Sequence, residues 1–183
     1  VVRNARAGET LTALDEANTT YNLEPSMLVI ADSQRPVAIA GIKGGVGSAI
    51  SSSTHDVVLE AACFDPVGIR ATSRMLGLRT DASVRFGYGV DPALAPAALV
   101  FCANLLVETA GGTSDIGVYD VYPSPKPQTT IMFDPAFARS LLGVQLSSEA
   151  MEQSLIHLGF EVRRQGDRFV VDVPSRRLDV TSQ

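Results

Sequence analysis

Three short apolar runs stand out in the first third of the chain. They cover Met27 to Ala31, Val37 to Ile42 and Val57 to Phe64, and polar or glycine-containing segments separate them. Runs of this length, rich in β-branched residues, predict β-strands. The third run has no clean alternation of apolar and polar positions, which predicts a strand covered on both faces. Glu60 alone interrupts its apolar character.

Two helices are predicted after these strands. The first begins at Asp65-Pro66, because aspartate caps free amides and proline suits the first helical position, and Gly77 marks its end. The second opens with the same pair at Asp91-Pro92 and ends near Gly111-Gly112. Its apolar stripe is expected to comprise Leu94, Ala98, Phe101 and Leu105.

A proline-rich string, YPSPKPQ at Tyr122 to Gln128, predicts an extended connector and a domain boundary. Beyond it, Asp134-Pro135 begins a short helix to Leu142, with Gly143 as its stop. Ser148 is expected to cap a second helix that ends at Gly159.

A hairpin is predicted to complete this part of the chain. Its strands run from Phe160 to Arg164 and from Arg168 to Val173, and they close through a turn at Gly166-Asp167. The order helix, helix, hairpin resembles a winged helix. The whole pattern predicts an α+β fold: a mixed or antiparallel sheet with packed helices in residues 1–122, and a small winged-helix-like module in residues 127–183.

Composition restricts the class of protein. Apolar residues make up 45% and charged residues 19% of 183, as in soluble globular proteins. No stretch approaches 18 consecutive apolar residues and the first ten lack a signal core, so we expect a cytoplasmic protein without membrane contact. Cys63 and Cys102 lie in apolar runs without metal-ligand spacing, which favours buried, reduced thiols.

The formal net charge of -5 allows nucleic acid to bind only through a local basic surface. Two groups of arginines meet this condition, and a solvated protein face is the alternative for both. The first group falls within sixteen residues and the second follows residue 160. They comprise Arg70, Arg74, Arg79 and Arg85, and then Arg163, Arg164, Arg168, Arg176 and Arg177.

The string KGGVGS at Lys43 to Ser48 follows an apolar run, as a phosphate-binding loop would. A Walker-type loop needs a lysine and then a serine or threonine after its last glycine, and here Ser48 and Ala49 occupy those positions. The sequence therefore argues against nucleotide hydrolysis. Glycines at this spacing fit either close backbone approach to a ligand or a tight strand turn.

Glu60 is the most informative single residue. A carboxylate inside an apolar strand is costly to bury unless it accepts hydrogen bonds or its pKa is raised. A solvent-facing position at a sheet edge is the alternative. His55 and His157 show no catalytic pattern, and no hydrolase motif of the G-x-S-x-G or H-E-x-x-H type occurs.

Several ordered segments are similar to those of one known family. They are VVRNARAGETLTALD at residues 1–15, MLVIAD at 27–32, VAIAGIKGG at 37–45, VVLEAACFDPVGIRATSRMLGLRTDASVRF at 57–86, GVDPAL at 89–94 and VPSRRLDV at 173–180. Together they resemble the bacterial phenylalanyl-tRNA synthetase beta subunit, as an internal part of it. The resemblance covers nearly the whole chain.

This resemblance implies a function. The family's enzyme joins phenylalanine to its tRNA with ATP and Mg²⁺, in a tetramer of two alpha and two beta subunits. The part matched by residues 1–122 is an editing domain, which hydrolyses tyrosine wrongly esterified to tRNA-Phe. The implied partners are the tRNA acceptor end, the tyrosine or phenylalanine moiety and the alpha subunit. A structural, RNA-docking scaffold without catalysis is the alternative.

The resemblance also implies site residues. Glu60 would accept a hydrogen bond from the tyrosine phenol, and Gly44, Thr80 and Ala82 would line the pocket. The family's histidine-bearing segment would lie upstream of Val1, which leaves the catalytic residues unassigned. From its charge, Arg79 is expected to face the tRNA acceptor end.

Two further positions bear on the resemblance. Asp179 matches the first of several magnesium ligands, of which the others would lie beyond Gln183. A single carboxylate holds magnesium poorly, so we expect neither a bound metal nor a cofactor in this part of the protein. In RFGYG at residues 85–89, Gly87 and Tyr88 replace a charged pair of the family, so an ion pair is expected to be lost.

Overall fold

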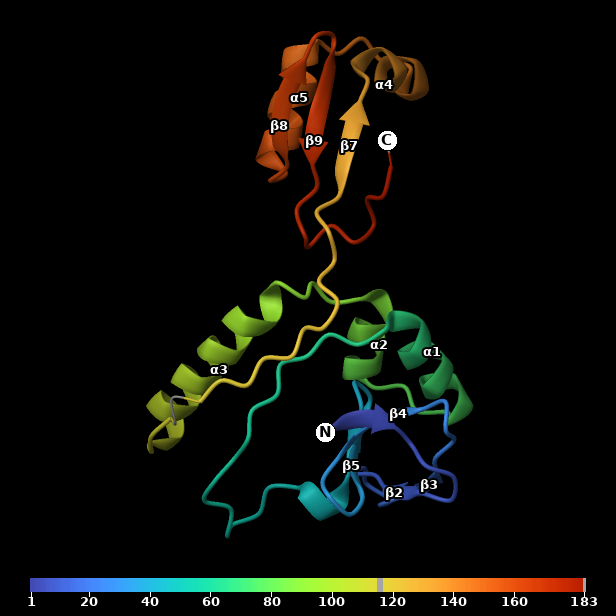
Figure 1. The fold of residues 1–183 in the computed structure, drawn as a ribbon, viewed down its shortest axis with the longest axis vertical. Helices are drawn as coiled ribbons and strands as arrows, with labels where there is room; N and C mark the ends of the chain where they lie inside the picture. Colours follow the sequence, from blue (N-terminus) through green and yellow to red (C-terminus); the bar gives the residue numbers. More distant parts are fainter. Residues whose placement is uncertain (115–116, 183) are drawn as a thin grey trace. The chain divides into compact units, whose positions relative to one another are not determined.

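The computed structural model describes residues 1–114 and 117–182. The chain forms two compact units, Val1–Thr109 and Ala110–Gln183 (Figure 1). Every strand pair within the described residues is antiparallel, and helices accompany the sheets in both units. The predicted α+β fold class is confirmed. No helix in these ranges has the length and apolar character needed to cross a membrane.

The first unit is built on a four-stranded sheet of order β1-β4-β5-β6. Its strands are β1 (Val2–Asn4), β4 (Leu28–Ala31), β5 (Pro36–Ile39) and β6 (Lys43–Gly44). A separate hairpin pairs β2 (Thr10–Thr12) with β3 (Thr20–Asn22). The first two predicted strands are thus confirmed, although the second ends at Ile39 because the chain turns there.

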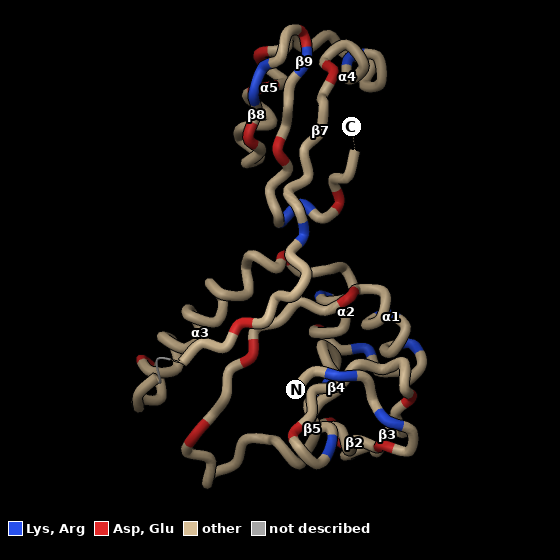
Figure 2. The backbone as a smooth tube through the Cα atoms, viewed as in Figure 1, with Lys and Arg blue, Asp and Glu red and all other residues tan. Residues whose placement is uncertain are grey.

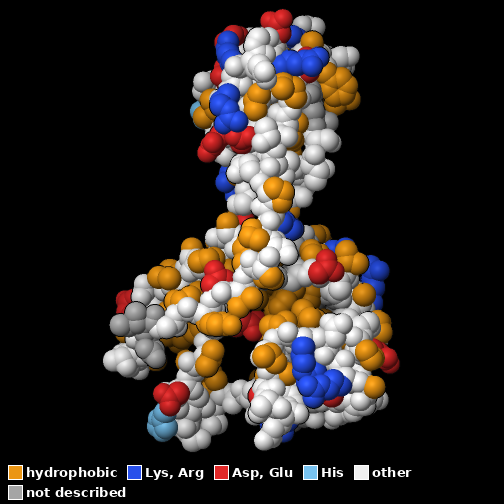
Figure 3. Space-filling view, viewed as in Figure 1, with side chains coloured by type: hydrophobic (Ala, Val, Ile, Leu, Met, Phe, Trp, Pro, Cys, Tyr) orange, Lys and Arg blue, Asp and Glu red, His pale blue; other side chains and the backbone are white. Residues whose placement is uncertain are grey.

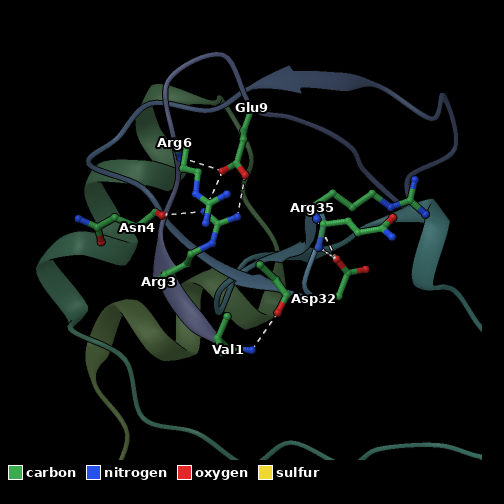
Figure 4. A network of polar contacts seen from close by, with 9 residues as sticks. Val1, Arg3, Asn4, Arg6, Glu9, Asp32 and Arg35 are labelled. Atoms are coloured by element: carbon green, nitrogen blue, oxygen red, sulfur yellow. Dashed lines mark hydrogen bonds and ion pairs between the residues drawn. The ribbon is translucent and has the colours of Figure 1, made fainter.

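Ion pairing and capping fix the loops around this sheet (Figure 4). Arg3 on β1 pairs with Glu9 at 2.6 Å, and the backbone N–H of Arg6 donates to the same carboxylate at 2.7 Å. The Arg3 side chain, with the Arg6 amide, lowers the pKa of Glu9 to about 2. Asp32 accepts hydrogen bonds from the amides of Gln34 and Arg35 and so closes the β4–β5 turn.

Two helices pack on the sheet through a shared apolar core. They are α1 (Pro66–Met75) and α2 (Asp81–Tyr88). The predicted start of α1 is confirmed, because the Asp65 carboxylate accepts from the amide of Gly68 at 2.7 Å. The core unites strand residues such as Val29 and Ile39, which are fully buried, with Ile69 of α1.

Gly41 lies where the sheet packs against α1 and α2. Its φ is +66°, and a Cβ there would stand 2.8 Å from Phe64 and 2.9 Å from Ile69. The rings of Phe64 and Phe86 meet beside it with centroids 5.1 Å apart. This position therefore requires glycine for both backbone conformation and space.

The long helix α3 (Leu94–Ala110) forms as predicted, starting two residues after Pro92. None of its side chains is buried, and Phe101 and Leu105 of the expected stripe are 68% and 46% exposed. The expected stripe is therefore not buried in a core, although Leu94 and Ala98 of it line a cleft. Figure 3 shows apolar side chains at the surface in this region.

The predicted strand from Val57 to Phe64 is wrong. Residues 55–65 have no regular structure, and Val58 is 96% exposed. In the described structure β1, β4, β5 and β6 complete the sheet, so this run has no ladder partner. The expectation of buried thiols is also wrong, because both cysteines are exposed. Cys63 lies in this irregular run, and Cys102 lies on α3, which has no buried residue.

The second unit places two helices beside a three-stranded sheet of order β7-β9-β8. Its elements are β7 (Thr130–Phe133), α4 (Pro135–Leu142), α5 (Ser148–His157), β8 (Glu161–Gln165) and β9 (Arg168–Asp172). The two helices and the hairpin confirm the predicted order, whereas β7 was not predicted. The cap of α5 is Ser147 rather than Ser148, since the Ser147 hydroxyl accepts from the Ala150 amide.

Replacing Gly41 by alanine is expected to destabilise the first unit by about 2 to 4 kcal/mol, from left-handed backbone strain and overpacking together. Gly77→Ala is the matched control, because Gly77 has φ +64° but open space around its Cβ position. It should cost about 1 to 2 kcal/mol. Urea unfolding followed by circular dichroism measures both, and equal losses would contradict the packing argument.

Candidate functional site

Glu60 lies on a cleft of about 390 Å³ within the first unit. Among the described lining residues it is the sole charged side chain. The cleft is lined by Gly41, Leu59, Glu60, Ala61, Ala62, Phe64, Phe86, Val90, Leu94, Ala95, Ala98, Leu99 and Cys102. The irregular segment before α1 thus faces the first turns of α3 across an apolar space that carries one acid.

The environment of Glu60 disfavours its charge. Desolvation by its apolar neighbours raises the pKa of the carboxyl, and the amino terminus of Val1 opposes this with a smaller effect. No described residue donates a hydrogen bond to the carboxylate or forms an ion pair with it. The residue is nevertheless exposed, so water solvates the carboxylate and a ligand can reach it.

The other three predicted pocket residues belong to a neighbouring group. Thr80 donates from its hydroxyl to the carbonyl of Ile42 at 2.8 Å and accepts from the amide of Ser83 at 3.0 Å, so it both caps α2 and holds the turn before Gly44. Ala82 follows in the first turn of α2 and is half-buried. These residues do not line the Glu60 cleft, but segment 41–44 touches both groups, since Gly41 lines that cleft.

The glycine string forms a tight turn. Val46–Ser48 is one turn of 3₁₀ helix, and the Ser48 hydroxyl donates to the Val37 carbonyl at 3.0 Å. A Cβ on Gly45 would stand 2.9 Å from the same oxygen. A second cleft of about 550 Å³ adjoins this turn, between β2 and β5, and Lys43 does not line it. The close packing supports the strand-turn interpretation.

The two arginine groups differ in their pairing. In the second unit Arg163 pairs with Asp172 at 2.6 Å, Arg164 with Glu152 at 2.6 Å and Arg168 with Asp134 at 3.2 Å. Arg176 donates to the Leu158 carbonyl and Arg177 to Asp179. In the first group, Arg70 donates to the Gly87 carbonyl at the end of α2. Arg74, Arg79 and Arg85 are exposed and have no hydrogen bond or ion pair with described residues.

Asp179 does not fit a magnesium site. Both of its carboxylate oxygens accept from the Arg177 guanidinium, at 2.9 and 2.8 Å, and this pairing lowers its pKa to about 2. Within residues 1–114 and 117–182, no three His, Cys, Asp or Glu side chains gather as a metal site would require.

Sequence reasoning missed the cleft's wall. Gly41, Phe86 and the α3 residues Leu94 and Ala98 line it, yet none stood out in the sequence for this role. One signal was present, because α3 carries a single charged residue, Glu108, in 17 positions. A helix that is apolar all round needs contacts on more than one face.

Comparison with known proteins identifies the class. Residues 1–111 match the B3/4 domain, and residues 131–183 match the tRNA synthetase B5 domain. Because the first match covers more than half of the chain, this protein belongs to the B3/4 domain family.

Individual relatives make the class more specific. The chain is 43% identical over 183 residues to the phenylalanine–tRNA ligase beta subunit of Moorella thermoacetica, 42% over 181 to that of Carboxydothermus hydrogenoformans and 42% over 180 to that of Xanthomonas campestris pv. campestris. These alignments cover 100%, 99% and 98% of this chain but 22% of each relative. The resemblance drawn from the sequence is confirmed.

Glu60→Gln is expected to remove a pH dependence of stability. Because the folded-state pKa of Glu60 is raised, its contribution favours the fold below its unfolded pKa of about 4.3 and is lost as pH rises through the folded value. The variant should therefore be more stable than the parent chain at pH 7, with the advantage shrinking towards pH 4. Urea titrations at both pH values test this, and a difference in stability between variant and parent that is the same at both pH values would contradict it.

Proposed function

We propose that this chain is the editing region of a phenylalanine–tRNA ligase beta subunit and hydrolyses tyrosine misattached to tRNA-Phe. Residues 1–122 form the editing domain, and residues 127–183 a small accessory module. The observation that carries the proposal is Glu60, a solvent-accessible acid without a partner among the described residues, on an apolar cleft. Such a site suits an aromatic ring that bears one hydroxyl.

Selectivity follows from desolvation. The apolar wall accepts either a phenyl or a phenol ring, but only the phenol donates a hydrogen bond to Glu60. Bound phenylalanine would cover the carboxylate without replacing its water, which costs about 1 to 3 kcal/mol or more for a charged group. A site that catalyses aminoacylation discriminates against an amino acid with one added hydroxyl by only about a hundredfold. A second site that selects for the hydroxyl can therefore remove the wrong product.

The neighbouring group supplies the ester side of the pocket. A Cβ on Gly44 would meet nothing within 4 Å, and Thr80 and Ala82 lie at the start of α2. Thr80 acts as a positioning residue, because its hydroxyl is already engaged with Ile42 and Ser83. Segment 41–44 links this group to the Glu60 cleft through Gly41.

Hydrolysis is assigned to a positioned water and a ribose hydroxyl of the substrate. Cys102 is the one thiol among the described lining residues, and no histidine lines the cleft to activate it. Substrate-assisted attack gains from orientation alone, without a side-chain nucleophile. The chain then binds the ester and excludes bulk water from the ring.

The whole protein's setting is part of the proposal. We assign the chain to a cytoplasmic enzyme of two alpha and two beta subunits that uses ATP and Mg²⁺ for aminoacylation. Synthesis is attributed to the alpha subunit, as the resemblance implies.

A structural, RNA-docking scaffold is the second candidate. It is favoured by one observation: Gly44, Thr80 and Ala82 do not line the cleft that contains Glu60. A pocket divided in this way would bind tRNA without cleaving its ester.

Deacylation assays separate the two candidates. The chain should hydrolyse tyrosyl-tRNA-Phe in preference to phenylalanyl-tRNA-Phe, and Glu60→Ala should lower that preference by about ten- to a hundredfold, as expected for a hydrogen bond to a charged group. Glu108→Ala, which removes an equal charge from the exposed end of α3, should leave the preference unchanged. If the chain binds tRNA but leaves both esters intact, the scaffold is correct.

A further inference from the structure

We propose that the α1–α2 hairpin carries the surface that binds the tRNA phosphate backbone, through Arg74, Arg79 and Arg85. We call these three residues the arginine face. The inference rests on the proposed function for the identity of the RNA. It assigns the phosphate contact to arginines of the first unit, rather than to the larger group of arginines in the second unit.

The arginine face has charge available for a ligand. Its guanidinium groups are exposed and have no described partner. Residues 65–89 contain four arginines against two acids, Asp65 and Asp81, in a chain whose net charge is -5. Asp65 is committed to capping α1. The hairpin is thus a local basic surface on an acidic protein.

The second arginine group lacks such charge. Arg163, Arg164 and Arg168 each pair with a carboxylate inside the second unit. Figure 2 shows acidic and basic positions near one another on β8 and β9, and basic positions together with the acid that begins α2 on the α1–α2 pair. A phosphate that approached these arginines would have to displace an existing ion pair. Binding there would therefore gain less than binding to unpaired guanidinium groups.

Hydrogen bonds also hold the α1–α2 helical hairpin together. Thr80 and Ser83 form a reciprocal capping box at the start of α2, and Arg70 reaches from α1 to the Gly87 carbonyl at its end. Gly87 permits this contact, because a Cβ there would stand 3.2 Å from the Arg70 Cγ. The Arg70 side chain thus ties the two helices together.

One member of the arginine face, Arg79, is next to the proposed pocket. Arg79 directly precedes Thr80, whose hydroxyl is bonded to Ile42 two residues before Gly44. An RNA strand held at Arg79 would bring its terminal ester to this group. Guanidinium suits the task, since its planar fork of donors matches phosphate oxygens and stays charged at every physiological pH.

A salt titration with tRNA tests the proposal. An unmodified tRNA-Phe transcript is titrated into the 183-residue chain from 50 to 200 mM KCl in roughly logarithmic steps, the range over which counterion release is strong. The double variant Arg74→Gln/Arg79→Gln should bind about tenfold more weakly, and its slope of log affinity against log salt should fall by about 1 to 2.

The matched control is Arg163→Gln/Arg168→Gln, which removes the same formal charge from the second unit. It should leave affinity and slope within about twofold of the parent chain. Equal weakening by both double variants, greater weakening by the control, or no RNA binding at 50 mM KCl would overturn the arginine face. Circular dichroism confirms that each variant is folded.

Deacylation of the same tRNA, measured at saturating protein, separates this proposal from the function. If the arginine variant loses affinity while the parent chain cleaves no ester, the surface stands and the editing function fails. If the parent chain cleaves tyrosyl-tRNA but the variant keeps its affinity and salt slope, editing stands and the surface fails.

Discussion

The first unit depends on the close approach of Gly41 to the aromatic pair Phe64 and Phe86. This contact joins the sheet to α1 and α2, because a side chain at residue 41 would hold them apart. The turn that contains Gly41 also receives the Thr80 hydroxyl through Ile42. Gly41 thus lies both in the wall of the Glu60 cleft and one residue before the carbonyl that accepts from Thr80 at the start of α2.

The two units differ in how their arginines are paired. In the second unit almost every arginine is satisfied by a nearby acid or carbonyl, so its charge serves the fold. In the first unit Glu60 and the arginine face are left without partners. Charged groups without a protein partner cost the fold little free energy while water solvates them. They can form hydrogen bonds or ion pairs when a complementary ligand binds. The proposed phenol and phosphate contacts use these two kinds of group.

Sequence reasoning found Glu60 but misjudged its setting. The carboxylate stood out because apolar residues flank it along the chain, and the structure places apolar residues around it in space. Those residues differ from the ones predicted: they include Phe86 and Ala98, from helices that the local pattern could not bring to Glu60. The predicted strand failed because strand formation needs a partner, and no partner is encoded in the run itself.

The sequence by itself determined the local features of this protein. Asp65-Pro66, Asp134-Pro135 and Gly143 set helix ends because capping involves residues within one turn of each other. Only the tertiary structure decided which charges are neutralised and which apolar runs are covered. Arg168 pairs with Asp134, 34 positions earlier in the chain, and no local pattern specifies a contact at that separation. Ion pairing and burial depend on positions in space, so they follow from the fold.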